Sequence, residues 1–358
     1  MNTNKDNDKF FDNKFWWYCT LFVLIAVLIS CLPYWLTSDS ILERNFSDSG
    51  QVGDTIGGIM SPFIALIASF LTFIAFWAQY KSNSKQTEQF RLQANDMKIE
   101  RFENKYYEMI KIHRDNVSEI TINDGVVIKR KAFISMLLEL RCAYYILKNM
   151  VDNSEIKNIE EKDIIDISYV TFFTGVGENS DKVAKTLLSK YNQESIEKYF
   201  KKLKDYKREY NKEILVPNTD INTSDRINSV IKKQNKIVIL YNNNIYSFTK
   251  YLPFNGHMSR LGHYYRHLFQ TVKFVINQEF SDMDESAVFK LKYQYLKTLR
   301  AQLSDYELLM LYYNSCSVLG EKWNENGYLT TWKFLKNIPT ALADFGINPE
   351  NKLGTENI

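Results

Sequence analysis

The chain has 358 residues, of which 45% are hydrophobic and 15% are aromatic. This composition supports a packed core and excludes an intrinsically disordered chain. The net charge of +3 is close to balance and argues neither for nor against a nucleic-acid partner. The four cysteines form no CxxC pair, which argues against a cysteine zinc site and a disulfide scaffold.

Two apolar segments near the N-terminus predict a transmembrane hairpin. Residues 15–36 carry no charged side chain and reach about 33 Å as a helix, enough to cross a hydrocarbon core of about 30 Å. Residues 56–80 form a second uncharged stretch. A cleaved signal peptide is the alternative for the first segment. The length of the apolar run, the lack of an A-x-A-like site and the second span argue against it.

The distribution of basic residues predicts the orientation of this hairpin. Lys14 precedes the first span, Lys81 and Lys85 follow the second, and the loop between the spans is acidic. Because basic residues stay on the cytoplasmic side, both termini are expected in the cytoplasm. The protein is therefore expected to be a multi-pass membrane protein.

Small residues recur at helical spacing along the second span and are called the seam here: Gly58, Ser61, Ala65, Ser69 and Thr72. Small side chains let two helix backbones approach closely in lipid. The seam is expected to pack against Ala26 and Ser30 of the first span, and the alternative is contact between copies of the chain.

Beyond the hairpin, which occupies residues 1–80, the apolar spacing predicts helices. A long connecting helix is expected over 81–122, ended by the turn at Asn123-Asp124-Gly125, with His113 as a packed, hydrogen-bonded core histidine. A helical cytoplasmic domain follows over 123–348. Its helices are expected at about 131–150, 181–210, 259–278 and 287–317, with a short one near 329–337. Residues 211–236 read as a loop and 349–358 as a flexible tail. No convincing set of strands is found, so the predicted class is all-α.

Three polar side chains on the helix expected at 259–278 form a ridge: Arg260, His263 and His267. At 100° per residue they fall within about 60° of each other, beside an apolar stripe that faces the core. His257 extends this ridge if the helix begins early enough.

Two chemistries suit the ridge, and a structural role is the alternative to both. His263 and His267 at i,i+4, with His257 as a third ligand, could hold a metal ion. Alternatively, a histidine could move protons at an RNA ribose hydroxyl while Arg260 offsets the phosphate charge. The spacing from Arg260 to His267 is similar to the R-x4-6-H arrangement of HEPN ribonucleases. In the structural reading, these side chains contact neighbouring helices.

A second polar row lies on the helix expected at 287–317 and consists of Arg300, Ser304, Glu307 and Asn314. Buried polar groups need partners, so the row either links this helix to another or orients the ridge. No Gly-rich phosphate loop or nucleophile elbow is found elsewhere.

Several blocks of sequence carry a resemblance to a known family. They are VGDTIGGIMSPFIALIASFLTF from Val52, FENKYYEMIKIHRDNVSEI from Phe102, KRKAF around Arg130, SYVTFFTGVGENS from Ser168, FNGHMSRLGHYYRHLFQTVKFV from Phe254 and LRAQLSDYELLMLYYNSCSVLG from Leu299. With these blocks the chain resembles the phage abortive infection proteins of bacteria, the AbiC-like family. Lys129-Arg130 departs from the Gly-Arg that this family tends to have.

The resemblance implies antiphage defence by abortive infection at the bacterial inner membrane. The expected effector is a HEPN-like ribonuclease that uses Arg260, His263 and His267, and no cofactor or metal is expected. The alternative is a non-enzymatic effector or sensor that oligomerises and perturbs the membrane on infection. The expected partners are the lipid bilayer, an RNA target, a phage-encoded trigger and a second copy of the chain.

Overall fold

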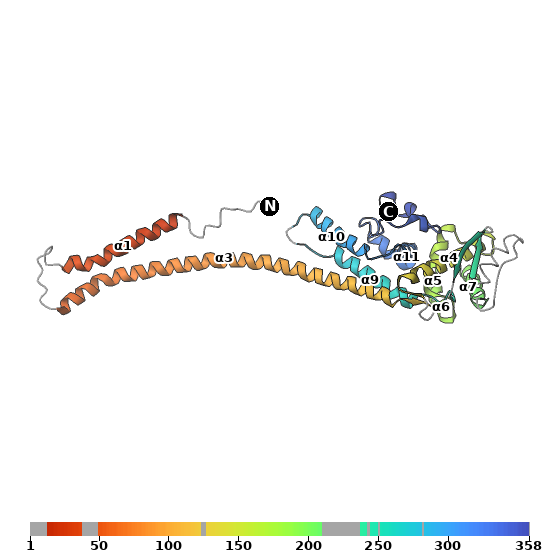
Figure 1. Ribbon diagram of the computed structural model, residues 1–358, viewed down its shortest axis with the longest axis horizontal. Coiled ribbons are helices and arrows are strands. Elements are labelled where there is room, and N and C mark those ends of the chain that lie inside the picture. The colour runs from red at the N-terminus through yellow and green to blue at the C-terminus, as the bar shows by residue number, and fades with distance from the viewer. Residues whose placement is uncertain are drawn as a thin grey trace. The chain divides into compact units, whose positions relative to one another are not determined.

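The computed structural model describes residues 13–37, 49–122, 127–209, 237–241, 244–249, 251–280 and 283–357, and Figure 1 shows their helices and strands. The chain forms two compact units, Met1–Asp96 and Met97–Ile358. Helices dominate both units, which confirms the all-α class. The boundary falls inside the long helix α3 (Ser49–Glu119), whereas the sequence predicted the hairpin to end at residue 80.

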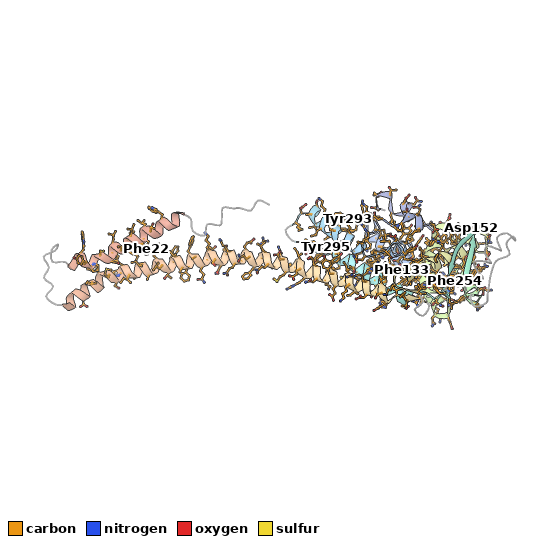
Figure 2. All side chains as sticks on the ribbon, viewed as in Figure 1. Phe22, Phe133, Asp152, Phe254, Tyr293 and Tyr295 are labelled. Carbon is orange, nitrogen blue, oxygen red and sulfur yellow. The ribbon has the colours of Figure 1, made fainter. Side chains whose placement is uncertain are left out.

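The first unit contains α1 (Asn13–Thr37) and the beginning of α3. Phe22 of α1 stacks on Phe70 of α3 with ring centroids 4.2 Å apart; Figure 2 labels Phe22. Among the described residues, one helical stretch, Ile56–Glu119, is long and apolar enough to cross a membrane, and Thr20–Trp35 is a shorter apolar stretch. The two-span hairpin therefore stays a prediction.

The seam lies on the exposed face of α3. Gly58, Ser61, Ala65, Ser69 and Thr72 are all exposed, whereas Phe63, Ile67 and Phe70 are half-buried. Because Phe70 is the residue that stacks on α1, the larger apolar side chains share the face of α3 that packs against α1. The seam is thus not buried against Ala26 and Ser30, and its small side chains remain accessible.

The second unit begins with residues 97–119 of α3 and continues through a series of helices. These are α4 (Arg130–Asp152), α5 (Glu161–Thr174), α6 (Glu178–Leu187), α7 (Gln193–Glu209), α9 (Met258–Ile276), α10 (Glu285–Arg300), α11 (Asp305–Ser315), α12 (Glu321–Glu325) and α13 (Pro349–Leu353). Three-residue 3-10 turns occur at Val318–Gly320, Thr340–Leu342 and Thr355–Asn357.

Two antiparallel hairpins, which the sequence did not predict, interrupt the helices. β1 (Thr121–Ile122) pairs with β2 (Val127–Ile128). β3 (Ile237–Tyr241) pairs with β4 (Asn244–Thr249), with a register shift after Ile239. The expected turn at 123–125 and the expected loop at 211–236 lie outside the described residues.

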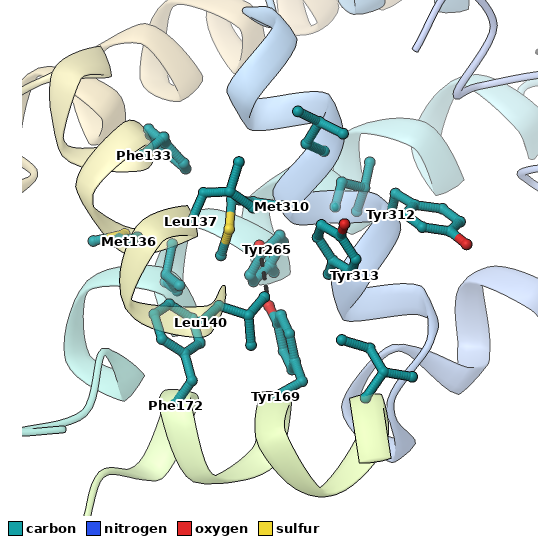
Figure 3. Packing of buried hydrophobic residues seen from close by; sticks show 14 of the residues in the cluster. Phe133, Met136, Leu137, Leu140, Tyr169, Phe172, Tyr265, Met310, Tyr312 and Tyr313 are labelled. Atoms are coloured by element: carbon teal, nitrogen blue, oxygen red, sulfur yellow. Dashed lines mark hydrogen bonds between the residues drawn. The ribbon is translucent and has the colours of Figure 1, made fainter. Parts of the chain in front are cut away.

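The core of the second unit forms where α4, α5, α9 and α11 meet, and Figure 3 shows its centre. Leu140 of α4, Phe172 of α5 and Met310 of α11 are all fully or almost fully buried. Tyr169 of α5 donates its hydroxyl hydrogen bond to Tyr265 of α9 at 3.1 Å (Figure 3). Pairing lets tyrosine hydroxyls enter an apolar core without an unsatisfied polar group.

Four local predictions differ from the structure. The helix expected at 287–317 is two helices, because α10 ends at Arg300 and Ser304 starts α11 with a capping box to Glu307. The helix expected near 329–337 is a series of turns. The expected flexible tail contains α13 with the buried Leu353. The charged helix expected at 181–210 is divided into α6 and α7.

Candidate functional site

The ridge lines a surface cavity of about 650 Å³, called the histidine cavity here. One wall is the polar face of α9, and the other is formed by Asn116 and Glu119 at the end of α3 and by Ile120 directly after it. The lining residues of α9 are Ser259, Arg260, His263, Arg266, His267 and Gln270. Spacings of three and four residues place them on one helix face. The structure therefore brings Arg260, His263 and His267 together, and adds Arg266.

A close crossing of two backbone segments fixes the start of α9. His257 N donates to Phe173 O at 2.8 Å and Val176 N donates to Phe254 O at 2.9 Å. Gly256 lies at this crossing with φ +83°, and a Cβ there would stand 2.4 Å from the carbonyl oxygen of Thr174. Only glycine fits such a contact and such a φ without strain. The crossing therefore holds the first turn of α9, and Arg260 with it, against the end of α5.

Arg260 connects α9 to the β1–β2 hairpin. Its Nε donates to Thr121 O at 2.6 Å and one terminal nitrogen donates to Gly256 O at 3.4 Å. These two bonds hold the guanidinium at the edge of the cavity. An arginine fixed in this way presents its remaining N–H groups in one orientation, which suits a bound phosphate.

The two histidines of the cavity differ in environment. His263 is exposed, and Arg266 lies with a terminal nitrogen 3.2 Å from His263 Nδ1. Because arginine can only donate, Nδ1 of His263 is the acceptor in this contact. His267 is half-buried, and burial lowers its pKa. A neutral imidazole at neutral pH can accept a proton, so His267 has the properties of a general base.

A buried polar network lies behind His267. The ring of His113 is stacked against that of His267, with centroids 6.3 Å apart and ring planes inclined by 24°. Nε2 of His113 is 3.9 Å from Oε1 of the buried Glu307. Glu307 also accepts a hydrogen bond from Tyr264 at 3.3 Å, and Arg130 Nε lies 3.4 Å away. Glu307 therefore lies close to His113 without a hydrogen bond to its ring, and the orienting role of the polar row stays a prediction.

His113 is buried, as the sequence predicted, but neither ring nitrogen has a hydrogen-bond partner among the described residues. The prediction of a hydrogen-bonded core histidine is wrong in that respect. Burial first, then the charges of His267 and Arg130, lower its pKa to about 4. The ring is therefore neutral at neutral pH, and its contact with Glu307 is not an ion pair under those conditions.

His257 does not join the ridge but belongs to a separate buried cluster around Glu139. Glu139 is fully buried on α4 and accepts from Tyr251 Oη, from Phe254 N at 2.6 Å and from His257 Nε2 at 2.9 Å. Figure 2 labels Phe254. The carboxylate thus fastens the segment before α9 to α4. The prediction that His257 extends the ridge is corrected, because its ring nitrogen turns to Glu139.

The other members of the polar row have structural contacts. Arg300 donates to Lys333 O at 2.8 Å, Ser304 caps α11, and the backbone carbonyl of the buried Asn314 accepts from Ser317 Oγ at 2.8 Å. These contacts link α10 and α11 to neighbouring segments. Within the described part of the chain, no group of three or more His, Cys, Asp or Glu side chains is placed to hold a metal ion.

Two functional features could have been found from sequence and were missed. Arg266 stands three residues after His263 and therefore on the same helix face. Glu139 is a single carboxylate in the apolar stretch ISMLLELRCAYYIL, and a charge at a core-facing position requires a partner. Its partners Tyr251 and His257 lie more than a hundred residues away, and no local pattern identifies them.

Together, the fold and the site define a mostly helical domain with a cationic, histidine-lined cavity on one face of α9. The model of the family described as "Putative phage abortive infection protein" matches residues 256–342, which include α9 and the histidine cavity's α9 wall. This match supports membership of an AbiC-like family and a role in phage defence by abortive infection. It covers about a quarter of the chain. No curated protein and no solved structure matches the chain.

Proposed function

We propose that the protein is an abortive-infection effector that cleaves RNA in the histidine cavity. The observation that carries the proposal is the single cavity of about 650 Å³ that two arginines and two histidines line together. This volume lies in the range of small-ligand sites, of roughly 300–1,000 Å³. Arginine guanidinium groups bind phosphate, and the histidines supply proton transfer.

The proposed reaction uses only the side chains of the cavity. His267 takes the proton of a ribose 2′-hydroxyl, and the 2′ oxygen forms a bond to phosphorus. The bond from phosphorus to the 5′ oxygen breaks, and that oxygen receives a proton from His263. The products are a 2′,3′-cyclic phosphate and a free 5′-hydroxyl. Arg260 and Arg266 offset the charge on the phosphate oxygens. Arg266 leaves His263 Nδ1 when it turns to the phosphate, which lets the ring be protonated.

The test is cleavage of a labelled single-stranded RNA by the full chain purified in detergent. His267→Gln should lower the rate by about 10²–10⁴, the usual contribution of general acid–base catalysis. Lys273→Gln is the matched control, because Lys273 is an exposed residue of α9 outside the cavity. The same variants are then compared in a phage-plating assay. Undiminished cleavage and defence by a folded His267→Gln protein would falsify the proposal.

The same proposal includes anchoring in the bacterial inner membrane with both termini in the cytoplasm. Its support is the apolar stretch of α3, the exposed apolar side chains of α1 and the basic residues that flank both. A reporter that is active only outside the cytoplasm should give signal when fused near residue 47 and none after Lys98. The opposite pattern would refute this orientation.

A second candidate function is a non-enzymatic effector or sensor that oligomerises and perturbs the membrane when a phage trigger acts. The exposed seam on α3 favours it, because small accessible side chains allow close helix contact in lipid. Ala65→Leu should then weaken crosslinking between copies in membranes and reduce defence. Leu66→Ala, at an exposed neighbouring position, is the control. Unchanged crosslinking in the Ala65→Leu protein contradicts this function.

A further inference from the structure

A second cavity of about 490 Å³ lies on α3 and the start of α4, and its lining is strongly basic. Arg114, Lys129, Arg130 and Lys131 line it, and none of its described lining residues is acidic. It is called the basic cavity here. Glu307, the carboxylate behind Arg130, is fully buried and already accepts from Ser304 and Tyr264. The cavity therefore presents positive charge to a ligand.

The first turn of α4 contributes to the same cavity. The turn contains Arg130 and Lys131 and no acidic residue, and its N-cap residue, Lys129, makes no side-chain cap. A helix N-terminus carries partial positive charge and unsatisfied N–H groups. Positively charged side chains at a helix N-terminus are repelled by this partial charge. An anion bound between them and the helix end removes the repulsion.

A buried group that faces the cavity supplies an independent observation. His113 lines the basic cavity, is 1% exposed, and has two ring nitrogens without a hydrogen-bond partner among the described residues. Buried polar atoms are ordinarily satisfied. The neutral ring therefore leaves one N–H unpaired beside the cavity, and a ligand oxygen reaches that N–H only after the ring or the neighbouring Arg130 shifts.

Besides Ser118, the remaining lining is apolar and consists of Val117 from α3 and Ile128 from β2. Inorganic phosphate would leave this surface uncovered. A purine or pyrimidine ring would cover it, and the volume of about 490 Å³ falls within the range of small-ligand sites, of roughly 300–1,000 Å³. We propose that the basic cavity binds a nucleotide, with its phosphates on Lys129, Arg130, Lys131 and the start of α4 and its base against Val117 and Ile128.

His113 connects this site to the histidine cavity, because the same ring lines the basic cavity and stacks on His267. Arg130 lines the basic cavity and also approaches Glu307. Nucleotide phosphates that draw Arg130 away would change the environment of His113 and His267. This regulatory step rests on the proposed function, whereas nucleotide binding does not.

Lys129 offers a variant that separates binding from folding. Its φ is +58°, in the region that favours glycine. Lys129→Gly therefore removes the charge and relieves backbone strain, so loss of folding is not expected. Lys131→Gln removes a second charge. The matched control is Lys201→Gln with Lys202→Gln, two exposed residues of α7 outside the cavity.

The experiment is calorimetric titration of the full chain in detergent with ATP, tripolyphosphate, adenosine and a ten-residue single-stranded RNA. The wild type should bind ATP more tightly than tripolyphosphate or adenosine. Lys129→Gly with Lys131→Gln should weaken ATP binding about 10-fold or more, because charge-assisted contacts to phosphate are lost. The α7 control and His267→Gln should bind ATP as the wild type does.

Other results overturn the assignment. The nucleotide site is refuted if the wild type does not bind ATP. It is also refuted if Lys129→Gly with Lys131→Gln binds ATP as tightly as the wild type does. Equal affinity for tripolyphosphate and ATP shows that no base is recognised. If the protein binds the RNA but not ATP, the basic cavity binds the RNA substrate and is not a nucleotide site. Failure of RNA cleavage with intact ATP binding refutes the proposed function and leaves the nucleotide site standing.

Discussion

The buried ring of His113 predicts a loss of stability in mild acid. Burial, and then the charges of His267 and Arg130, lower its pKa to about 4, against about 6.5 for an unfolded chain. Because the folded-state pKa is depressed, the unfolded chain binds the proton first as the pH falls. The contribution to stability is therefore complete above pH 6.5 and is lost as the pH falls towards 4.

The size of this effect follows from the two pKa values. Between pH 7.5 and pH 5.0 the linkage relation gives a loss of about 2 kcal/mol for this one group. At roughly 2–4 °C per kcal/mol for a domain of this size, the expected fall in Tm is about 4–8 °C. His113→Phe keeps an aromatic ring against His267 and Tyr264 and removes the titration.

The assay compares the Tm of wild type and variant at pH 7.5 and pH 5.0, in the full chain in detergent. The fall in Tm between these pH values should be about 4–8 °C smaller in His113→Phe than in the wild type. This difference isolates His113 from His267, whose pKa burial also lowers. The exposed His263→Gln is the control and should show the wild-type fall. An equal fall in His113→Phe and wild type would show that the buried ring does not resist protonation.

Three further predictions concern the contacts that hold α9 and α11. Glu139→Ala leaves two buried donors unpaired, Phe254 N and His257 Nε2, while Tyr251 keeps its 3.3 Å bond to Ser135 O. It should cost about 2–5 kcal/mol, at about 1–3 kcal/mol for each unpaired group with partial relaxation. Gly256→Ala places a Cβ 2.4 Å from Thr174 O at φ +83° and should cost more than about 2 kcal/mol. Ser304→Ala removes the capping box of α11 and should cost about 1 kcal/mol. Each is measured as a change in Tm of the full chain.

Control variants test whether each of these three losses of stability comes from the contact named for it. Gly262→Ala is the control for Gly256→Ala. Gly262 lies inside α9, and the atom nearest to an added Cβ, Phe173 Cζ, is 3.9 Å away. Because alanine favours a helix more than glycine does, this variant should raise the Tm slightly. Equal Tm values for the two glycine variants would show that the crossing with α5 is loose. Glu139→Gln should recover part of the loss of Glu139→Ala, and no recovery would mean that the carboxylate is not an acceptor for its neighbours. An unchanged Tm for Ser304→Ala would mean that α11 does not depend on its cap.

The helices were predictable where one apolar face repeats over many residues. α4 was expected at 131–150 and runs from Arg130 to Asp152, and α9 was expected at 259–278 and runs from Met258 to Ile276. Boundaries that depend on a single side chain were missed. Ser304 with Glu307 forms an S-x-x-E signature for a helix start, but the two residues were interpreted as part of one continuous polar row.

The β3–β4 hairpin was also visible in the sequence and was missed. The segment IVILYNNNIYSFT is rich in β-branched and aromatic residues and has three consecutive asparagines between its two apolar runs, a pattern typical of a hairpin. It follows a long polar stretch that reads as a loop, and an isolated hairpin is weak without a surface to pack on. Here α4 supplies that surface by contact with both strands, and such tertiary support is not encoded locally.

The candidate site was predictable in part, because helical spacing alone groups Arg260, His263 and His267. The sequence could not predict which histidines are structural, since that depends on partners from distant segments. Glu139 binds His257 across 118 residues, and Glu307 approaches His113 from α11. Residues far apart in the chain therefore determine the chemical role of residues that look equivalent in one sequence block.

The partners of the four histidines restrict the chemistry of the domain. His257 is bonded to Glu139 and His113 is buried and neutral, so only His263 and His267 can exchange protons with a ligand in the histidine cavity. Glu139 fixes the segment before α9, and Glu307 fixes its middle through Tyr264. A site on a helix held at two points keeps its geometry. Loss of Glu139 should thus reduce stability and defence together, whereas loss of His263 should reduce defence alone.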